Sequence, residues 1–254
     1  MSWDTQLRSN SIARIAGITR VRNESKIIKS TLDHYSQFCN EGIWVFDHNS
    51  SDNTAEICKS HPSVRQVITQ DFVEKNPWVS QGGHRTFLLR HAMKSDADWF
   101  FCFDADERAE IDLSLIDFAA VDAVRLRVFD FYITPGDVDH HWLDRLWMGP
   151  EYRDILMLFR KSRIDRFGCR EPELLSGSVV TCCGYVRHYG KAMSMDEWER
   201  KCDGGTQRSG LSVKARQYMR YLTLVAHFYG KYAQLITWED REIKGVSIPL
   251  NANY

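Results

Sequence analysis

The sequence predicts an α/β fold, in which a mostly parallel central sheet is flanked by helices on both faces. Three observations predict it. Short apolar runs, typical of buried strands, alternate with segments of helical period through the first half of the chain. Polar and acidic turns follow several of these runs, as expected at the carboxyl edge of such a sheet. The 254 residues are enough for one domain with a sizeable core.

The first half supplies the strands of this sheet. We expect them at 12–19, 43–46, 64–68 and 99–103. Helices fall between them, and the first has Asn23 as its N-cap and an inward apolar stripe at helical spacing. The stripe is formed by Ile27, Ile28, Leu32, Tyr35 and Phe38. A second helix follows the polar turn at 47–54, and a third covers 82–93.

The second half adds strands and then helices. Residues 123–131 alternate along their length, which predicts a half-exposed strand, and further strands are expected at 155–160 and 179–185. A capping-box pattern begins a helix at Ser194, and a long amphipathic helix covers about 211–236. Its polar face is basic and carries Arg216, Arg220, His227 and Lys231. Since no linker or repeat interrupts the chain, we expect a single domain over 1–254.

Composition narrows the class of protein. A net charge of -1 argues against a nucleic-acid binder, because such proteins carry a strongly basic face. Seven cysteines without any Cys-x-x-Cys pair are typical of reduced thiols in a cytosolic protein. The chain has no run of 18 apolar residues and its polar start does not resemble a signal peptide. We therefore expect a cytoplasmic protein.

Three carboxylates follow the most apolar strand. The run 99–103 ends at Asp104, and Asp106 and Glu107 come directly after it. Side chains two apart in an extended segment point the same way, so Asp104 and Asp106 repel each other unless a cation lies between them. Carboxylate oxygens suit Mg²⁺ or Mn²⁺ together with substrate phosphates. The alternative is an acidic turn that caps the next element.

Three stretches occur in a familiar order, at 19–24, 45–54 and 103–107. Together they resemble the family 2 glycosyltransferases of the GT-A fold, whose Asp-x-Asp motif matches Asp104 and Asp106. The resemblance implies a GT-A-type, Rossmann-like sheet with a C-terminal helical region. It implies a nucleotide-sugar-binding half at 1–110, an acceptor and catalytic half at 111–192, and C-terminal helices at 193–254.

The resemblance also implies roles for individual residues. Asp47 matches the aspartate that contacts the nucleotide base, and Asp106 matches the metal ligand, with Asp104 near the ribose and the metal. His188 follows the last strand, where a histidine reaches the metal or the diphosphate, and Lys191 is placed to clamp phosphate oxygens. The loop that lines the nucleotide pocket contributes Thr19, Arg22 and Glu24. One departure is His48, where many members have a second aspartate.

Transfer of a sugar also needs a carboxylate that deprotonates the acceptor hydroxyl. In related transferases it follows a strand at the position of 166–175, where Glu173 fits best and Glu171 is the alternative. Both glutamates could instead flank a surface turn at Pro172. The implied activity is inverting, metal-dependent transfer from a nucleoside-diphosphate sugar, with UDP favoured, to a hydroxyl of a glycan, a lipid-linked or another glycoconjugate acceptor.

Two other functions stay open. A relative that binds sugar nucleotides or carbohydrates without catalysis would retain Asp104 and Asp106 but lack a base. A nucleotidyltransferase is disfavoured, because 19–24 has no glycine for a phosphate-binding loop. The basic helix at 211–236 could lie at the inner face of a membrane, but its apolar stripe favours docking on its own domain.

Overall fold

The computed structural model describes residues 13–69, 77–134, 136–137, 139–194 and 235–248. The helices expected at 194–202 and 211–236 therefore lie outside the described residues, apart from the ends at Ser194 and at 235–236. No helix in the described part of the chain is both long enough and apolar enough to cross a membrane.

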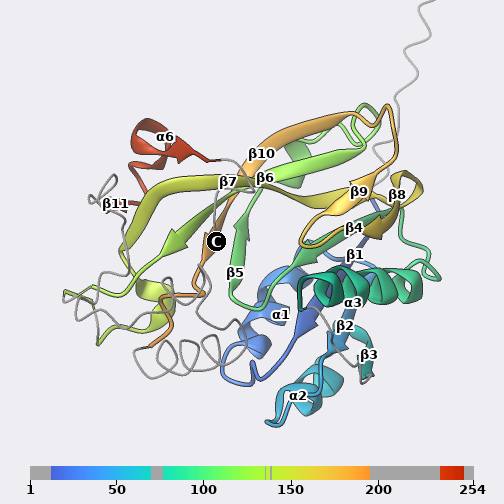
Figure 1. The fold of residues 1–254 in the computed structure, drawn as a ribbon, viewed down its shortest axis with the longest axis horizontal. Coiled ribbons are helices and arrows are strands. Elements are labelled where there is room, and N and C mark those ends of the chain that lie inside the picture. Colours follow the sequence, from blue (N-terminus) through green and yellow to red (C-terminus); the bar gives the residue numbers. More distant parts are fainter. Residues whose placement is uncertain (1–12, 70–76, 135, 138, 195–234, 249–254) are drawn as a thin grey trace, which may run out of the picture.

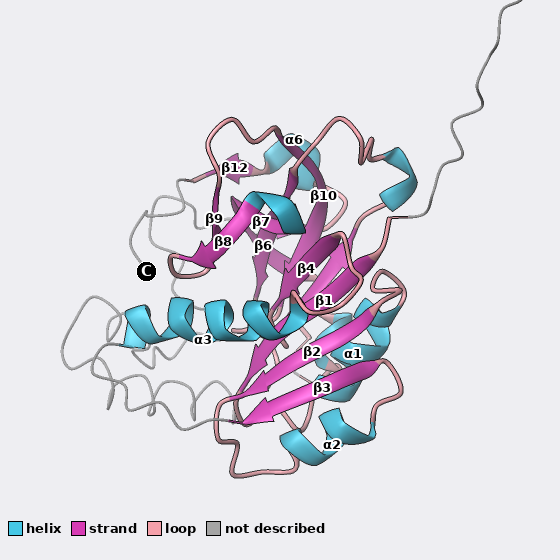
Figure 2. Cartoon of the chain, turned by 90° about the vertical axis from the view of Figure 1, so that its right-hand side faces the viewer, coloured by secondary structure: helices cyan, strands magenta, loops and turns pink. Residues whose placement is uncertain are grey.

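The first half of the chain forms the parallel part of the sheet (Figures 1 and 2). Its strands lie side by side in the order β3-β2-β1-β4, and every pair is parallel. They are β1 (Ile15–Val21), β2 (Gly42–Asp47), β3 (Val64–Thr69) and β4 (Trp99–Phe103). The helices that connect them are α1 (Ile28–Ser36), α2 (Thr54–Ser60) and α3 (Pro77–Ala92). The expected alternation of strand and helix is confirmed.

Helices cover both faces of this parallel part. Tyr35 of α1 stacks on Phe103 of β4 with ring centroids 3.6 Å apart, and Phe101 lies in the same core. Leu88 of α3 packs with Phe100 on the other face. All five residues of β4 are buried, because its side chains alternate between the two cores. The α/β class with helices on both faces is thus confirmed.

The second half continues the same sheet with mixed pairing. The order runs on as β4-β7-β6-β10-β5, and β7 is antiparallel to both β4 and β6, whereas β10 is parallel to β6. These strands are β5 (Glu107–Glu110), β6 (Ala123–Phe131), β7 (Trp147–Arg160) and β10 (Val180–His188). Parallel pairing therefore dominates only the first half, and β7 extends well beyond the strand expected at 155–160.

Small elements complete the fold. A separate two-stranded hairpin is formed by β8 (Ile164–Phe167) and β9 (Pro172–Leu174). After the undescribed segment the chain returns to β7 as β11 (Ile236–Thr237), α6 (Arg241–Lys244) and β12 (Val246–Ser247).

Asn23 does not cap α1, so that prediction is wrong. The N-cap is Ile27, while Asn23 adopts a left-handed conformation with φ of 56°. Its side-chain oxygen accepts a hydrogen bond of 2.8 Å from the Ser51 amide. Asparagine tolerates this conformation, and its hydrogen bond connects the loop after β1 to the loop after β2.

Candidate functional site

The acidic segment forms a tight turn between β4 and β5. The Asp104 amide donates to the Glu107 carboxylate at 2.8 Å, which closes the turn on itself. From α1, the Thr31 hydroxyl donates to the Ala105 carbonyl at 2.5 Å. Since β1, β2 and β4 are parallel, this turn emerges at the same edge of the sheet as the loops after β1 and β2.

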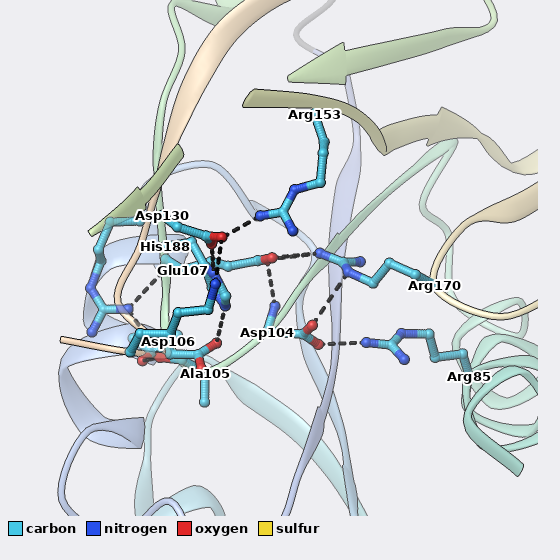
Figure 3. A network of polar contacts seen from close by, with 12 residues as sticks. Arg85, Asp104, Ala105, Asp106, Glu107, Asp130, Arg153, Arg170 and His188 are labelled. Carbon is cyan, nitrogen blue, oxygen red and sulfur yellow. Dashed lines mark hydrogen bonds and ion pairs between the residues drawn. The ribbon is translucent and has the colours of Figure 1, made fainter. Parts of the chain in front are cut away.

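Asp104 is held by two arginines that come from distant parts of the chain (Figure 3). Arg85 of α3 donates to one carboxylate oxygen at 2.5 Å, and Arg170, from the β8–β9 loop, lies 3.3 Å from the other. Arg170 also contacts both carboxylate oxygens of Glu107 at 2.8 Å. Burial alone would raise the Asp104 pKa, but the charges of Arg170 and Arg85 outweigh it and lower the pKa. Asp104 is therefore ionised and charge-balanced by the protein itself.

A close helix contact brings these arginines together. A Cβ atom added at Gly82 of α3 would overlap the carbonyl oxygen of Gly168 in the β8–β9 loop. Glycine therefore lets α3 and that loop approach closely. The approach places Arg85 and Arg170 on the same carboxylate.

Asp106 faces a histidine instead. His188, at the end of β10, has its Nε2 atom 3.6 Å from an Asp106 oxygen and its Nδ1 atom 2.5 Å from an Asp130 oxygen (Figure 3). Burial opposes the charged imidazolium, but Asp106 and Asp130 outweigh this and raise the His188 pKa to about 10. The imidazole thus bridges two carboxylates.

Asp130 anchors the other side of that histidine. It lies near the end of β6, is 8% exposed, and pairs with Arg153 at 2.9 Å and with Lys191 at 3.2 Å. Burial would raise the Asp130 pKa, but Arg153, Lys191 and His188 hold it well below its ordinary value.

Sequence reasoning missed Asp130, although a signal existed. It continues the register of the apolar residues Val124, Leu126 and Val128, which places a carboxylate on the buried face of the strand, where it needs a partner. The arginines at 85 and 170 left no comparable signal, because their partner is distant in sequence.

The loops after β1 and β2 are tied to each other. The Asp47 carboxylate accepts hydrogen bonds from the hydroxyl and amide of Ser50, and the Glu24 amide donates to Thr54 at 2.8 Å. Thr19 is 1% exposed and its hydroxyl has no hydrogen-bond partner in the described structure, whereas Arg22 is exposed. The expected nucleotide-pocket residues therefore lie at one edge, with Asp47 acting as the anchor of a turn.

His48 belongs to a second cluster that the sequence did not reveal. Arg20 donates to Nδ1 of His84 at 3.0 Å and lies 3.0 Å from Nδ1 of His48. Phe46 stacks on the His84 ring with centroids 4.8 Å apart. Where the family pattern has a second aspartate, this chain thus has a histidine that pairs with an arginine.

The two glutamates predicted as bases lie elsewhere. Glu171 forms a two-pronged contact with Arg125, at 2.6 and 3.2 Å, and accepts from the Leu156 amide at 2.7 Å. Glu173 is half exposed on the β8–β9 hairpin and pairs with Arg166 at 2.6 Å. Within the described residues, neither carboxylate contacts the network around Asp106. By contrast, Asp104, Asp106, His188 and Lys191 are brought together.

Asp106 and His188 fit a divalent cation. No group of three or more His, Cys, Asp or Glu side chains in the described part of the chain is arranged to hold a metal, so the described residues offer two ligands at most here. A Cβ added at Gly190 would lie 2.8 Å from His188 Nε2 and 2.9 Å from Asp106 Oδ2, so a side chain at residue 190 would crowd both of these atoms. Asp130 orients the imidazole from its far side, as carboxylates do behind metal-bound histidines. Two protein ligands plus phosphate oxygens are typical of nucleotide-bound cations.

Comparison with known proteins identifies relatives of unassigned function. No family model matches the sequence. Uncharacterized proteins of Mycobacterium tuberculosis and Mycobacterium bovis are each 31% identical to it over 189 residues, which make up 73% of this chain and 41% of each relative. The chain thus spans about two fifths of the length of the curated relatives it matches.

Solved structures are similar only at a low level. Staphylococcus aureus TarS matches with a TM-score of 0.42 and 13% identity, over 81% of this chain and 42% of that one. Glucosyl-3-phosphoglycerate synthase from Mycobacterium tuberculosis, in complex with Mn²⁺, UDP and glucosyl-3-phosphoglycerate, matches with a TM-score of 0.39 and 14% identity. That match covers 89% of this chain and 87% of the synthase. The function is therefore argued from this chain's own residues.

Proposed function

We propose that this protein is a metal-dependent, inverting glycosyltransferase. Its donor would be a nucleoside-diphosphate sugar, with UDP favoured, and its acceptor a hydroxyl of a glycan, a lipid-linked or another glycoconjugate. The observation that carries the proposal is the pair Asp106 and His188, 3.6 Å apart at the carboxyl edge of the sheet and backed by Asp130. The resemblance of 19–24, 45–54 and 103–107 to family 2 glycosyltransferases supports it.

Asp106 and His188 would hold Mn²⁺ or Mg²⁺. When bound, this ion would act as a Lewis acid that neutralises the charge growing on the departing diphosphate. Asp130 would hold His188 so that Nε2 stays directed toward Asp106. Lys191, whose ammonium lies 3.2 Å from Asp130, would contact the diphosphate as a point charge.

The nucleoside would lie over the loops after β1 and β2. Asp47 would contact the base, and Thr19, Arg22 and Glu24 would line the pocket, as the family resemblance implies. Asp104 would lie near the ribose, since Arg85 and Arg170 keep it ionised and able to accept hydrogen bonds.

Glu173 is our preferred general base. Glu171 is already engaged on both oxygens, by Arg125 and by the Leu156 amide, so it is less available to a substrate hydroxyl. Glu173 is half exposed, and its ion-pair partner in the described part of the chain is the exposed Arg166. We expect Glu173→Gln to lower turnover by about 10²- to 10⁴-fold, the usual contribution of a general base, with donor binding unchanged. Full turnover in this variant would remove Glu173 from the mechanism.

The test is calorimetric titration with UDP, GDP, CDP and dTDP, each with Mn²⁺ and with EDTA. We expect one nucleotide, UDP, to bind only when Mn²⁺ is present. Turnover of the matching sugar donor then separates an enzyme from a binding protein that lacks the chemistry. Absence of metal-dependent binding for all four nucleotides would contradict the proposal.

A further inference from the structure

Arg108 follows the acidic turn directly and is almost completely buried, at 6% exposed. Its Nη1 atom donates to the Ala105 carbonyl at 3.1 Å and to the Glu107 carbonyl at 2.7 Å. Its Nη2 atom donates to the Ser30 hydroxyl of α1 at 2.8 Å. One guanidinium therefore holds the carbonyl groups on both sides of Asp106.

The burial of this charge is not explained by an ion pair. Within the described residues, no carboxylate lies within salt-bridge distance of Arg108, and its guanidinium carbon lies 4.9 Å from the centre of the Trp142 ring. Burial of a charged group costs folding free energy, and an apolar side chain would fill the same space at a lower cost. The hydrogen bonds that Arg108 forms are therefore the reason to look for a role. Arg108 donates two of its hydrogen bonds to backbone carbonyls of the turn.

A further backbone hydrogen bond restrains Asp106. The Tyr189 amide donates to the Asp106 carbonyl at 2.8 Å. Three successive carbonyls, those of Ala105, Asp106 and Glu107, are thus fixed by hydrogen bonds. With both flanking peptide groups held, the Asp106 side chain keeps one direction relative to His188, which adjoins Tyr189.

We propose that Arg108 is a positioning residue, which fixes the Asp106 backbone so that its carboxylate and His188 present one preformed site to a divalent cation and the diphosphate of a nucleotide. This inference rests on the function proposed above. Arg108 itself would touch neither ligand. Its contribution is pre-organisation, because a carboxylate already in place loses less conformational freedom on binding.

Arg160 provides a matched control. It also donates to two backbone carbonyls, those of Phe118 and Val121, and lies over a tryptophan, Trp99, at 4.8 Å. It pairs with Trp99 at the start of β4, whereas Arg108 follows the end of that strand. The two arginines therefore share contacts with backbone carbonyls and a tryptophan, but Arg160 also pairs with Asp122 at 3.1 Å and lies at the other end of β4.

The experiment compares Arg108→Lys with Arg160→Lys in the full chain. A lysine keeps the charge but cannot hold two carbonyls and a hydroxyl at once. We expect Arg108→Lys to weaken Mn²⁺ binding, followed by electron paramagnetic resonance without nucleotide, by about 10- to 100-fold. Metal-dependent UDP affinity should fall by a similar factor, and hydrogen exchange at 104–108 should accelerate. Arg160→Lys should leave all three readouts unchanged.

Equal Mn²⁺ affinity in Arg108→Lys and wild type would overturn the inference, as would an equal loss in both variants. If Arg108→Lys does not fold, Ser30→Ala decides, since it removes only the anchor of Nη2 and should weaken Mn²⁺ binding about twofold to fivefold, a smaller step than loss of a whole supporting partner. An unchanged affinity in Ser30→Ala would then count against the inference. Wild-type protein that binds Mn²⁺ but no nucleotide would contradict the proposed function, and weaker Mn²⁺ binding in Arg108→Lys would then still support the positioning role of Arg108.

Discussion

Two acidic pairs in this protein share the same spacing but differ in their surroundings. Asp104 and Asp106 follow β4, whereas Glu171 precedes β9 and Glu173 lies within it. In each pair the first carboxylate is fixed by arginine: Asp104 by Arg85 and Arg170, and Glu171 by the two-pronged contact with Arg125.

The second member of each pair is held differently. Asp106 lies against His188, whose imidazole can lose a proton and bind a metal instead. Glu173 pairs with Arg166 at the surface. The sequence spacing brings two carboxylates close together in each pair. The side chains around them then decide which carboxylate has a structural role and which one can take part in binding or catalysis.

The largest expected effect is that of Asp106→Asn. Removing one of two protein ligands should weaken metal-dependent nucleotide binding by at least about 100-fold, the upper end of what loss of a supporting partner costs. The unfolding temperature should also fall, because Asp106 stabilises the partly buried charge of His188. Calorimetry with UDP and Mn²⁺ measures the first quantity and thermal unfolding the second. Retained metal-dependent nucleotide binding in this variant would contradict the assignment of Asp106, rather than Asp104, as the metal ligand.

The next effect is that of Asp104→Asn, and it should appear in stability. Arg85 has a side chain only 4% exposed, and Asp104 is its one ion-pair partner among the described residues. Leaving a buried charge without its partner should cost about 3 kcal/mol of unfolding free energy. Denaturant unfolding measures it, with Asp98→Asn as control because the Arg14–Asp98 pair is exposed. A loss no larger than in the control would contradict the structural role of Asp104.

A smaller effect is expected for Glu171→Gln. The change removes the ion pair with Arg125, whose side chain is 33% exposed, so solvent compensates for part of the loss. We expect the unfolding free energy to fall by about 1 kcal/mol. Glu173→Gln, in the exposed pair with Arg166, should leave it within about 0.5 kcal/mol of wild type. Equal stability of Glu171→Gln and Glu173→Gln would contradict the structural role of Glu171.

The smallest effect concerns His34 of α1, which supports the strand that follows the acidic turn. Its Nε2 atom lies 3.0 Å from the Ala109 carbonyl, and burial together with Arg108 lowers its pKa from 6.5 to about 4. Between those pH values the unfolded chain binds a proton that the folded protein does not, so stability rises with pH in this window. Below pH 6.5 wild type should therefore lose stability that His34→Gln retains.

Because His34 is partly exposed, we expect a difference below about 1 kcal/mol. Urea unfolding of both proteins at pH 7 and pH 5 measures it, and the other titrating groups cancel between the two proteins. A wild type that is stabilised relative to His34→Gln on acidification would reverse the sign and contradict the neutral state of His34.

The sequence by itself determined the α/β class and the position of the acidic turn. Both depend on local patterns: apolar runs alternate with helical stripes, and the run 99–103 stops at Asp104. Parallel strands then bring the loops after β1, β2 and β4 to one edge without further information. The structure brings His188 and Lys191 into one polar network with Asp130 and Asp106, and their functional roles stay predictions.

Only the tertiary structure decided the pairing of β7 and the partners of the carboxylates. The antiparallel insertion of β7 between β4 and β6 pairs Phe101 with Leu158 and Phe131 with Met148, and local periodicity does not specify which strands pair. Arg85, Arg125 and Arg170 reach their carboxylates through contacts between α3, the sheet and the β8–β9 loop. A charge–charge contact depends on distances in space, and the sequence records only distances along the chain.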